Sequence, residues 1–413
     1  MTDLWFFTAE SLLLIVFVFF VAVKNDAKRG LIAGLIAVKG VILWVVVSKN
    51  FDLSPALWAY LIIFAAALGI ITALSGPAAP WKGAKGFIVL CLAMIFLALF
   101  SAGCGKNSSS MPEIAGEYKL DFVPSKIAMQ SNDEIFVGAE RGRAVYIFDT
   151  DNFNKKSSIA AGYMPVDMVF YLDKLFTANK ASNTITMHDM LNGKSTQVPC
   201  GGESPSAIAV NGARGVLYVA NTGSSSVSVI DIKAEEPSVK KIMQVGKWPS
   251  DLYLSPDNRY LYVCCKYTNT VQIIDAEKEE PVFTRIDTGI SPSQFVPISG
   301  RDIAIINEWE YVYNHQSSII IFDRIHYSME YDIMVDGGIF DAALSGSKRY
   351  LYISVPLKDK IIFVDIKKRE TAFELRFKDY LPKWVCVSKD GKWLYAACQQ
   401  SEKIVKIAVN SLR

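Results

Sequence analysis

The chain has little of what many enzymes use for catalysis. Its 413 residues include only three histidines, His188, His315 and His326. They fall in two different repeats of the pattern described below, so they do not predict a metal cluster. The sequence also contains no CxxC or CxxCH motif, no GxSxG elbow and no phosphate-binding P-loop. No catalytic residues, no metal site and no cofactor are therefore predicted.

Net charge is also small. The formal net charge is +2, and the first 104 residues hold 7 of the 43 basic and 4 of the 41 acidic residues. The rest of the chain therefore carries 36 basic and 37 acidic residues. Binding to a nucleic-acid backbone requires a surplus of positive charge on one face. The balance argues against a nucleic-acid partner.

Long apolar runs are confined to the N-terminal region. Each is 18 to 20 residues long, enough to cross a hydrocarbon core of about 30 Å, and they cover residues 4–23, 31–48, 55–74 and 86–103. Basic residues concentrate in the first and third connections, as with Lys28 and Lys82. The positive-inside rule places those connections in the cytoplasm, so Met1 and everything after Gly103 are expected outside it.

One ionisable residue, Lys39, falls deep in the second apolar run. A charge at that depth costs a few kcal/mol on insertion scales. Three interpretations remain open: snorkelling of the side chain to the outer surface, an ion pair with Glu10 or a partner subunit, and a proton relay. A relay needs a series of ionisable groups, and this region supplies only these two within its spans.

The fourth apolar run also resembles a lipoprotein signal. A basic start at Lys82 and Lys85 precedes the apolar core, and Ser-Ala-Gly stands before Cys104. The resemblance implies cleavage before Cys104 and lipidation of that cysteine. Ser101 stands where such signals usually carry leucine, and three other runs precede this one. Residues 105–116 then form a Gly/Ser/Asn-rich tether.

A repeated pattern organises the remainder of the chain, and it is clearest between Gly202 and Gly289. Four short runs of β-branched and aromatic residues, separated by turn residues, occur there twice. A repeat of about 40 residues with four strands is typical of a propeller blade. The residues that open the successive innermost strands predict seven blades: Pro124, Pro165, Pro205, Pro249, Pro292, Asp341 and Pro382.

Two further landmarks recur once per repeat. The second strand carries an aromatic residue in six repeats: Phe136, Phe176, Tyr218, Tyr262, Tyr352 and Tyr395. The third strand ends in aspartate in six repeats: Asp149, Asp189, Asp231, Asp275, Asp323 and Asp365. An aspartate in that position accepts hydrogen bonds from backbone amides of the following turn. We interpret these carboxylates as turn devices, because a catalytic residue should break the repeat.

The last repeat, residues 381–413, contains only three strands, whereas a spare strand, residues 117–122, precedes the first repeat. We expect this strand to complete the seventh blade, because closure removes the unpaired edge of the ring. The predicted fold is therefore an all-β seven-bladed propeller over residues 117–413. An α-helical transmembrane region of four spans, residues 1–104, precedes it.

The runs LYVAN at Leu217–Asn221 and VSVID at Val227–Asp231 resemble the YVTN-type repeat of seven-bladed propellers from bacterial and archaeal envelopes. The resemblance covers residues 117–413. It implies the fold and leaves several functions open, since such propellers serve as scaffolds, adhesins, lactonases and cofactor-binding enzymes.

Two places depart from the repeat. One is the Trp248–Pro249 entrance to the fourth blade. The other is an insertion in the fifth blade, residues 306–318, which carries Glu308, Trp309, Glu310, Tyr311, Tyr313 and His315. Aromatic residues mixed with carboxylates on a loop suit partner recognition. The alternative is a longer hairpin that packs on its own blade.

Together these features favour a non-enzymatic, multi-pass protein of the bacterial inner membrane with its propeller on the periplasmic or extracellular side. The propeller would serve as an interaction scaffold or accessory subunit, and its partners would be the lipid bilayer and other subunits of a membrane complex. Two alternatives remain. One is a lactonase-like or cofactor-dependent dehydrogenase enzyme with a site in the central channel, and the other is an envelope-assembly lipoprotein processed at Cys104.

Overall fold

The computed structural model describes residues 111–234, 236–308 and 316–409. All of them belong to the second of two units, which divide between Gly105 and Lys106. The four expected membrane spans, the pair Lys39 and Glu10, and Cys104 lie outside the described residues. Within the described ranges, no helix is long and apolar enough to cross a membrane.

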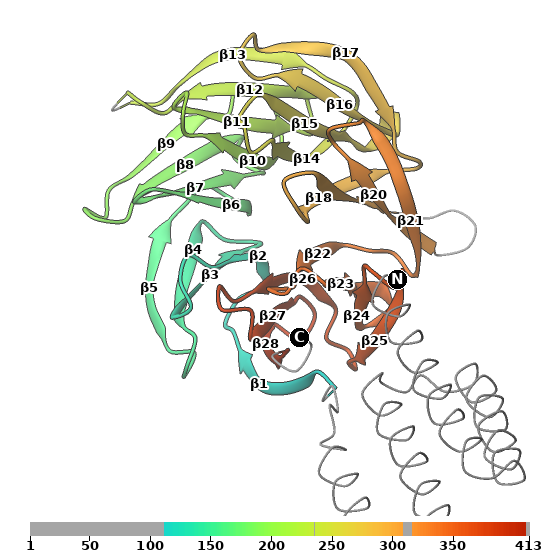
Figure 1. The fold of residues 1–413 in the computed structure, drawn as a ribbon. Helices are drawn as coiled ribbons and strands as arrows, with labels where there is room; N and C mark the ends of the chain where they lie inside the picture. The colour runs from blue at the N-terminus through green and yellow to red at the C-terminus, as the bar shows by residue number, and fades with distance from the viewer. Residues whose placement is uncertain (1–110, 235, 309–315, 410–413) are drawn as a thin grey trace, which may run out of the picture. The chain divides into compact units, whose positions relative to one another are not determined.

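Seven four-stranded antiparallel sheets are arranged around a ring, which confirms the seven-bladed propeller (Figure 1). The innermost strands are β2 (Pro124–Ala128), β6 (Pro165–Tyr171), β10 (Pro205–Asn211), β14 (Pro249–Leu254), β18 (Pro292–Pro297), β22 (Asp341–Leu344) and β26 (Pro382–Val387). The second strands are β3 (Glu134–Ala139), β7 (Lys174–Asn179), β11 (Val216–Asn221), β15 (Tyr260–Cys265), β19 (Asp302–Asn307), β23 (Tyr350–Val355) and β27 (Trp393–Cys398).

The third and fourth strands continue each blade towards the rim. The third strands are β4 (Ala144–Asp149), β8 (Thr184–Asp189), β12 (Ser226–Asp231), β16 (Thr270–Asp275), β20 (Gln316–Asp323), β24 (Lys360–Asp365) and β28 (Lys403–Ala408). The outer strands are β5 (Lys155–Ala160), β9 (Ser195–Pro199), β13 (Ser238–Gln244), β17 (Glu280–Asp287), β21 (Ser328–Asp336), β25 (Glu370–Arg376) and β1 (Glu113–Lys119). Two 3-10 turns, η1 (Lys266–Thr268) and η2 (Pro356–Lys358), follow second strands.

The core lies between neighbouring blades, because both faces of each sheet are covered. Strand β11, VLYVAN, is buried at all six positions, as a strand in the middle of a stack requires. The outer strand β13 of the same blade is mostly exposed on alternate residues. In one inter-blade cluster, Tyr352 and Phe363 of the sixth blade pack with Leu394 of the seventh. The six recurrent aromatic residues of the second strands are all fully buried.

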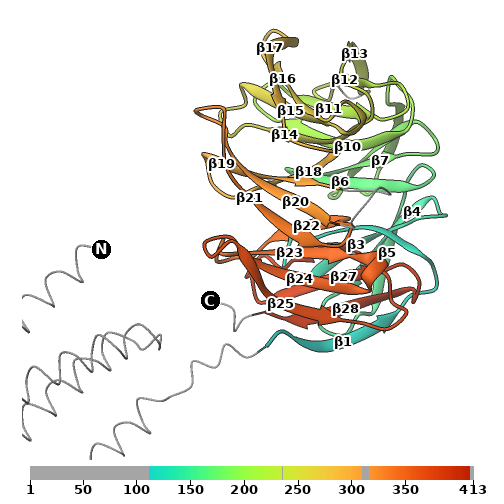
Figure 2. The same ribbon diagram turned by 90° about the vertical axis from the view of Figure 1, so that its right-hand side faces the viewer.

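The ring closes between the two ends of the propeller sequence. Strand β1 pairs antiparallel with β28, so the seventh sheet has the order β1-β28-β27-β26. Figure 2 views the ring from the side and shows β1 beside β28. Tyr118 of β1 also stacks on Phe153 of the first blade, with ring centroids 3.8 Å apart. The closing strand therefore joins the last blade to the first.

The bounds of the closing strand differ from the sequence-based expectation. β1 covers residues 113–119, whereas the sequence predicts a strand over 117–122 and a tether that reaches residue 116. A register shift between Ile114 and Gly116 lets the strand continue through the glycine. The four residues before Glu117 thus belong to the sheet and not to the tether.

The role of Asp341 also needs correction. β22 begins at Asp341, yet Asp341 pairs with Ser354, the last but one residue of β23. An opening proline such as Pro205 pairs with the last residue of the second strand, Asn221. Asp341 is therefore equivalent to the residue two positions after the proline, and Ile339 takes the proline's place. The insertion in the preceding blade obscures this register in the sequence.

Ring closure can be tested at Tyr118. We expect Tyr118→Ala to lower the stability of the purified full-length protein by about 1–2 kcal/mol, because it removes a half-buried stacked ring. Tyr118→Pro should lower the melting temperature further, since proline also removes a backbone N–H of β1, which pairs with β28 at this position. Scanning calorimetry measures both. Equal melting temperatures for the two variants would show that β1 pairing does not stabilise the ring.

Candidate functional site at the centre of the ring

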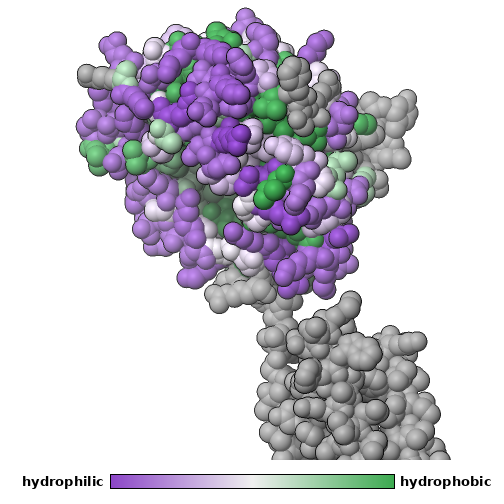
Figure 3. Space-filling view, turned by 45° about the horizontal axis from the view of Figure 1, so that its top comes forward, coloured by the Kyte–Doolittle hydropathy of each residue, from purple (hydrophilic) through white to green (hydrophobic). Residues whose placement is uncertain are grey.

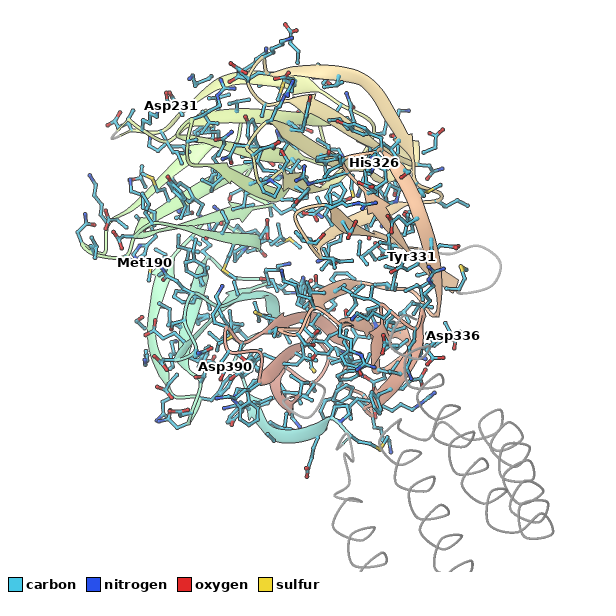
Figure 4. The ribbon with its side chains drawn as sticks, viewed as in Figure 1. Met190, Asp231, His326, Tyr331, Asp336 and Asp390 are labelled. Carbon is cyan, nitrogen blue, oxygen red and sulfur yellow. The ribbon has the colours of Figure 1, made fainter. Side chains whose placement is uncertain are left out.

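The recurrent third-strand aspartates are turn devices, as the sequence predicts. Oδ1 of Asp189 accepts hydrogen bonds from the backbone N–H groups of Leu191 and Asn192, at 2.9 and 3.1 Å. The same pair of bonds occurs after Asp149, Asp275, Asp323 and Asp365. These bonds lower the pKa of Asp189. Figure 4 shows a further member, Asp231, at the rim of its blade, away from the centre of the ring.

The innermost strand of each blade is a sheet edge, so its centre-facing backbone groups have no strand partner. Serine side chains supply partners for the carbonyl groups. The serine after one opening proline donates to the carbonyl of the opening proline in the next blade, as in Ser206 Oγ to Pro249 O at 2.8 Å. Ser125 and Ser250 make the same contact with Pro165 and Pro292, at 2.5 and 3.3 Å.

Carboxylate and amide side chains supply acceptors for the N–H groups. Each stands two positions after the opening residue and accepts from the innermost strand of the next blade. The four bonds are Ile208 N–H to Asp167 Oδ2 (2.9 Å), Phe295 N–H to Asp251 Oδ2 (2.7 Å), Ala342 N–H to Gln294 Oε1 (2.9 Å) and Val385 N–H to Asp341 Oδ2 (2.8 Å). Gln294 Nε2 also donates to Asp341 Oδ1 at 2.9 Å. We call five side chains the central cluster: Lys126, Asp167, Asp251, Gln294 and Asp341.

Lys126 occupies the equivalent position in the first blade. Its Nζ lies 3.7 Å from Oδ1 of Asp341, in the sixth blade. Burial alone would lower the pKa of Lys126, but the negative charges of Asp341, Asp167 and Asp251 outweigh it and raise the pKa. Blades one and four are not neighbours, so Lys126 and Asp251 interact across the centre of the ring. The cluster therefore gathers side chains from five blades around one axis.

The carboxylates of the cluster outnumber its single cation. Burial raises the pKa of Asp251 to about 7. The hydrogen bond from the Phe295 N–H lowers this pKa, whereas the negative charge of Asp167 raises it. Burial also raises the pKa of Asp167, although Lys126 opposes the shift. Asp251 is thus poised to gain or lose a proton near neutral pH. Among residues 111–234, 236–308 and 316–409, no group of three or more His, Cys, Asp and Glu side chains is placed to hold a metal ion.

His188 and His326 lie apart from this cluster. His188 Nδ1 contacts Ser195 Oγ at 2.8 Å, and His326 Nδ1 contacts Asp323 Oδ2 at 2.5 Å, both towards the rim. Of the loop residues singled out in the sequence, Glu308 is described and pairs with Lys266 of the preceding blade at 3.0 Å. The others, Trp309, Glu310, Tyr311, Tyr313 and His315, lie outside the described residues.

The entrance to the fourth blade is irregular in its side chain and not in its backbone. Trp248 has a positive φ of 60°, but the residues before four other opening prolines do too: Met164, Ser204, Ser291 and Leu381. In those blades the position carries methionine, serine or leucine. The Trp248 ring is 40% exposed and packs on Tyr267, with centroids 4.8 Å apart. Trp248 thus adds an exposed aromatic ring to a backbone conformation shared by most blades.

Sequence reasoning missed the central cluster. Its signal was the residue two positions after each opening proline, which is polar or charged in the first, second, fourth and fifth blades: Lys126, Asp167, Asp251 and Gln294. A cluster that draws one residue from each of several blades, with different residue types, does not show as a motif.

Comparisons with known proteins support the fold. The family described as "Lactonase, 7-bladed beta-propeller" matches residues 166–297, which is less than half of the chain and spans the second to fifth blades. A structure of hydrazine synthase from Kuenenia stuttgartiensis is similar with a TM-score of 0.60 and 18% identity, over 70% of this chain and 97% of that chain. No curated protein matches the chain.

A second similar structure is the β-propeller domain of Cps50 (Swd1) from Myceliophteria thermophila. Its TM-score is 0.62 at 11% identity, and the match covers 72% of this chain and 99% of that chain. At such identities, both structures show the fold alone.

The raised pKa of Asp251 predicts a pH-dependent stability. The folded protein holds this proton more tightly than the unfolded chain, so the stabilisation is complete below pH 3.8 and is lost as the pH rises through about 7. We expect wild-type stability to fall by about 1 kcal/mol between pH 6 and pH 8 through this group. Asp251→Asn keeps an acceptor for the Phe295 N–H and should show a smaller fall in chemical denaturation.

The matched control is Asp133→Asn, at an exposed position outside the cluster. It should retain the wild-type difference between pH 6 and pH 8. If Asp251→Asn also retained it, Asp251 would not titrate in this range.

Proposed function

We propose that the protein is a membrane-anchored, extracytoplasmic docking platform, an accessory subunit of a bacterial inner-membrane complex. The observation that carries the proposal is a set of exposed apolar side chains on one face of the propeller. This is the face on which the innermost strands begin and the second strands end, and we call it the entry face. It carries Trp248, Tyr267, Ile290 and Leu357, which are 40%, 61%, 48% and 80% exposed.

The first three of these residues stand on adjoining segments, and we call them the entry-face patch. Trp248 precedes the opening proline of the fourth blade, Tyr267 belongs to η1 after the second strand, and Ile290 lies between the fourth and fifth blades. Large aromatic side chains are the residues that most often dominate protein interfaces. Figure 3 shows that the visible propeller surface is largely hydrophilic, with small hydrophobic patches. A local aromatic patch on such a surface suits specific docking.

The patch is held in place by the backbone beneath it. Lys266 N–H donates to the carbonyl of Trp248 at 3.0 Å, and Tyr267 N–H donates to the carbonyl of Lys247 at 3.1 Å. The two segments that carry the aromatic rings are therefore bonded to each other. A partner would bind a surface that is already ordered, so less conformational entropy is lost on binding.

The N-terminal region supplies the anchor in this proposal. Its four apolar runs are long enough to span a bilayer, and the basic residues of its connections favour an extracytoplasmic propeller. Lys39 and Glu10 would form an ion pair within the membrane or towards a partner subunit. Cleavage and lipidation at Cys104 would instead leave a lipid-anchored propeller on the same side of the membrane.

Docking can be tested by photo-crosslinking in cells that express the full-length chain. A photoreactive amino acid at position 267 should give a discrete protein adduct, identified by mass spectrometry. Trp248→Ala should reduce that adduct by about tenfold, because it removes the neighbouring ring of the patch. Position 172 provides a matched control. Leu172 is 73% exposed, but it lies in the turn between β6 and β7, on the face of the propeller opposite the entry face. Equal adducts at both positions, or none at 267, would contradict the docking role.

The orientation has its own test. Reporter fusions at Met1 and Arg413 should both report the extracytoplasmic side, since an even number of spans separates them. The intact mass of the purified protein should include residues 1–103. Reporters on opposite sides would refute the four-span arrangement, whereas loss of 103 residues with added acyl mass would establish the processed lipoprotein.

A second candidate is an enzyme of the lactonase type, favoured by the family match over residues 166–297. That segment includes Asp167 and Asp251 of the central cluster. Hydrolysis of simple lactones by the purified protein, lost in Asp251→Asn, would support it. No turnover above the rate of the uncatalysed reaction would leave the docking platform as the better explanation.

A further inference from the structure

The face opposite the entry face carries an uneven distribution of charge. It consists of the turns that join first to second strands and third to fourth strands, and we call it the exit face. In blades one to four, the described residues of these turns include five basic and seven acidic side chains. In blades five to seven, the turns hold nine basic side chains and one acidic side chain, that of Asp390. We call these nine basic side chains the basic patch; they lie in residues 298–301, 324–327, 345–349, 366–369 and 388–392.

The turns of the sixth blade are in contact with both neighbouring blades. Gly346 of the sixth blade lies so close to Gly391 of the seventh that a Cβ added to Gly346 would stand 3.0 Å from the Cα of Gly391. On the other side, the guanidinium group of Arg369 lies over the Tyr331 ring of the fifth blade, 3.9 Å from its centroid. Tyr331 Oη also donates to the carbonyl of Ile366 at 3.1 Å. The basic patch is therefore one surface across three consecutive blades.

Several cations of the patch have no acidic partner. Lys348, Lys367 and Lys389 are exposed, and none of them has a carboxylate at ion-pairing distance among the described residues. Lys392 provides a contrast, because it pairs with Asp390 at 3.2 Å. Three unpaired ammonium groups on neighbouring turns create a positive potential that attracts anions to this side of the ring.

Exposed apolar side chains belong to the same turns. Ile325 and Tyr327, in the turn 324–327, are 56% and 42% exposed. An aliphatic side chain and a tyrosine ring with its polar hydroxyl group both suit the boundary between lipid head groups and acyl chains. A nucleic-acid backbone offers phosphate groups to lysines but no partner to an exposed isoleucine. The combination of positive charge and apolar side chains therefore favours a lipid surface.

The chain also enters the propeller on the exit face. Glu113, the first residue of β1, pairs with Ala408, and Ala408 pairs with Trp393, directly after the turn 388–392. Only residues 104–112 connect the fourth apolar run with β1, and fully extended they reach at most about 30 Å. If the fourth run is held in a bilayer, as in the proposed function, that bilayer lies within reach of the exit face.

We propose that the basic patch docks the propeller on anionic lipids of the membrane that anchors it. The inference rests on the membrane anchor of the proposed function. Lys348, Lys367 and Lys389 attract the lipid phosphate groups, and Ile325 and Tyr327 insert at the level of the head groups. The attraction falls off within a Debye length of about 10 Å, so the patch lies close to the bilayer surface. The entry-face patch, on the opposite face, then stays accessible to a partner protein.

Amine labelling of the full-length protein in nanodiscs tests this contact. One set of discs contains phosphatidylcholine alone, and the other also contains the anionic lipid phosphatidylglycerol. Peptide mass spectrometry gives the acetylation rate of each lysine. We expect Lys348, Lys367 and Lys389 to react about fivefold more slowly in the anionic discs, because head groups cover them. Two exposed lysines should react at equal rates in both discs: Lys194, on the exit face of the second blade, and Lys378, on the entry face of the sixth.

The results distinguish failure of the docking surface from failure of the anchor. A protein that enters neither kind of disc lacks the anchor, which refutes the proposed function and this inference together. A protein that enters both, with equal rates at every lysine, refutes the lipid contact alone. Equal slowing of the three patch lysines in both kinds of disc would overturn the role of lipid charge. Protection by a DNA oligonucleotide in detergent, with none in the anionic discs, would assign the patch to nucleic acid instead.

Charge reversal assigns the contact to the patch. Lys367→Glu combined with Lys368→Glu should reduce the protection of Lys348 to less than about twofold, because two cations become anions beside the lipid. Both substituted side chains are exposed, so the fold is retained. The matched control reverses two exposed lysines in exit-face turns of blades two and three, Lys194→Glu with Lys233→Glu, and should keep the wild-type protection. Equal protection of Lys348 in the two double variants would refute the proposal.

Discussion

Every blade presents an unpaired strand edge to the centre of the ring. The backbone N–H and C=O groups on that edge need hydrogen-bond partners, and the rest of the structure depends on how they are supplied. Buried backbone N–H and C=O groups without partners are costly, so the chain must provide partners from elsewhere. Here they come from the neighbouring blade, as with Ser206 to Pro249 and Phe295 to Asp251. At the rim of the seventh blade, β1 pairs with β28 and supplies the outer strand that the last repeat lacks. Blades are thus joined at the centre by side chains and at the closure by a strand.

This solution has an electrostatic consequence. Aspartates serve well as acceptors for N–H groups, but three of them converge on one axis with a single lysine. The attraction to Lys126 compensates only part of the desolvation of Asp167 and Asp251, so the pKa values of both carboxyl groups are raised. Protonation of Asp167 or Asp251 is tolerated because a protonated carboxyl group can still accept the backbone hydrogen bond. Asp167 and Asp251 therefore both join neighbouring blades and have raised pKa values.

Much of the fold could be predicted from the sequence, because a blade is a local unit. The turn residues, the recurrent buried aromatics and the third-strand aspartates each act within one repeat, so they recur at a regular spacing. The central cluster could not be predicted in that way, since Lys126 meets Asp341 only once seven sheets have closed. The bounds of β1 were missed for a related reason: the bulge at Gly116 depends on the partner β28, some 290 residues away. Asp341 was misaligned because the insertion before it hides the register of β22.

The proposed docking role of the entry face depends on one backbone feature. Residues before five of the opening prolines have positive φ values between 53° and 63°, a conformation that costs non-glycine residues energy. It persists because the carbonyl of each such residue accepts a hydrogen bond from the residue after the second strand of its own blade, as in Lys266 to Trp248 and Lys180 to Met164. The same bonds fix the positions of the side chains on both segments. Trp248 and Met164 are therefore held by equivalent bonds in different blades. Because these bonds join backbone groups, the side chain at this position can differ from blade to blade without altering the backbone that carries it.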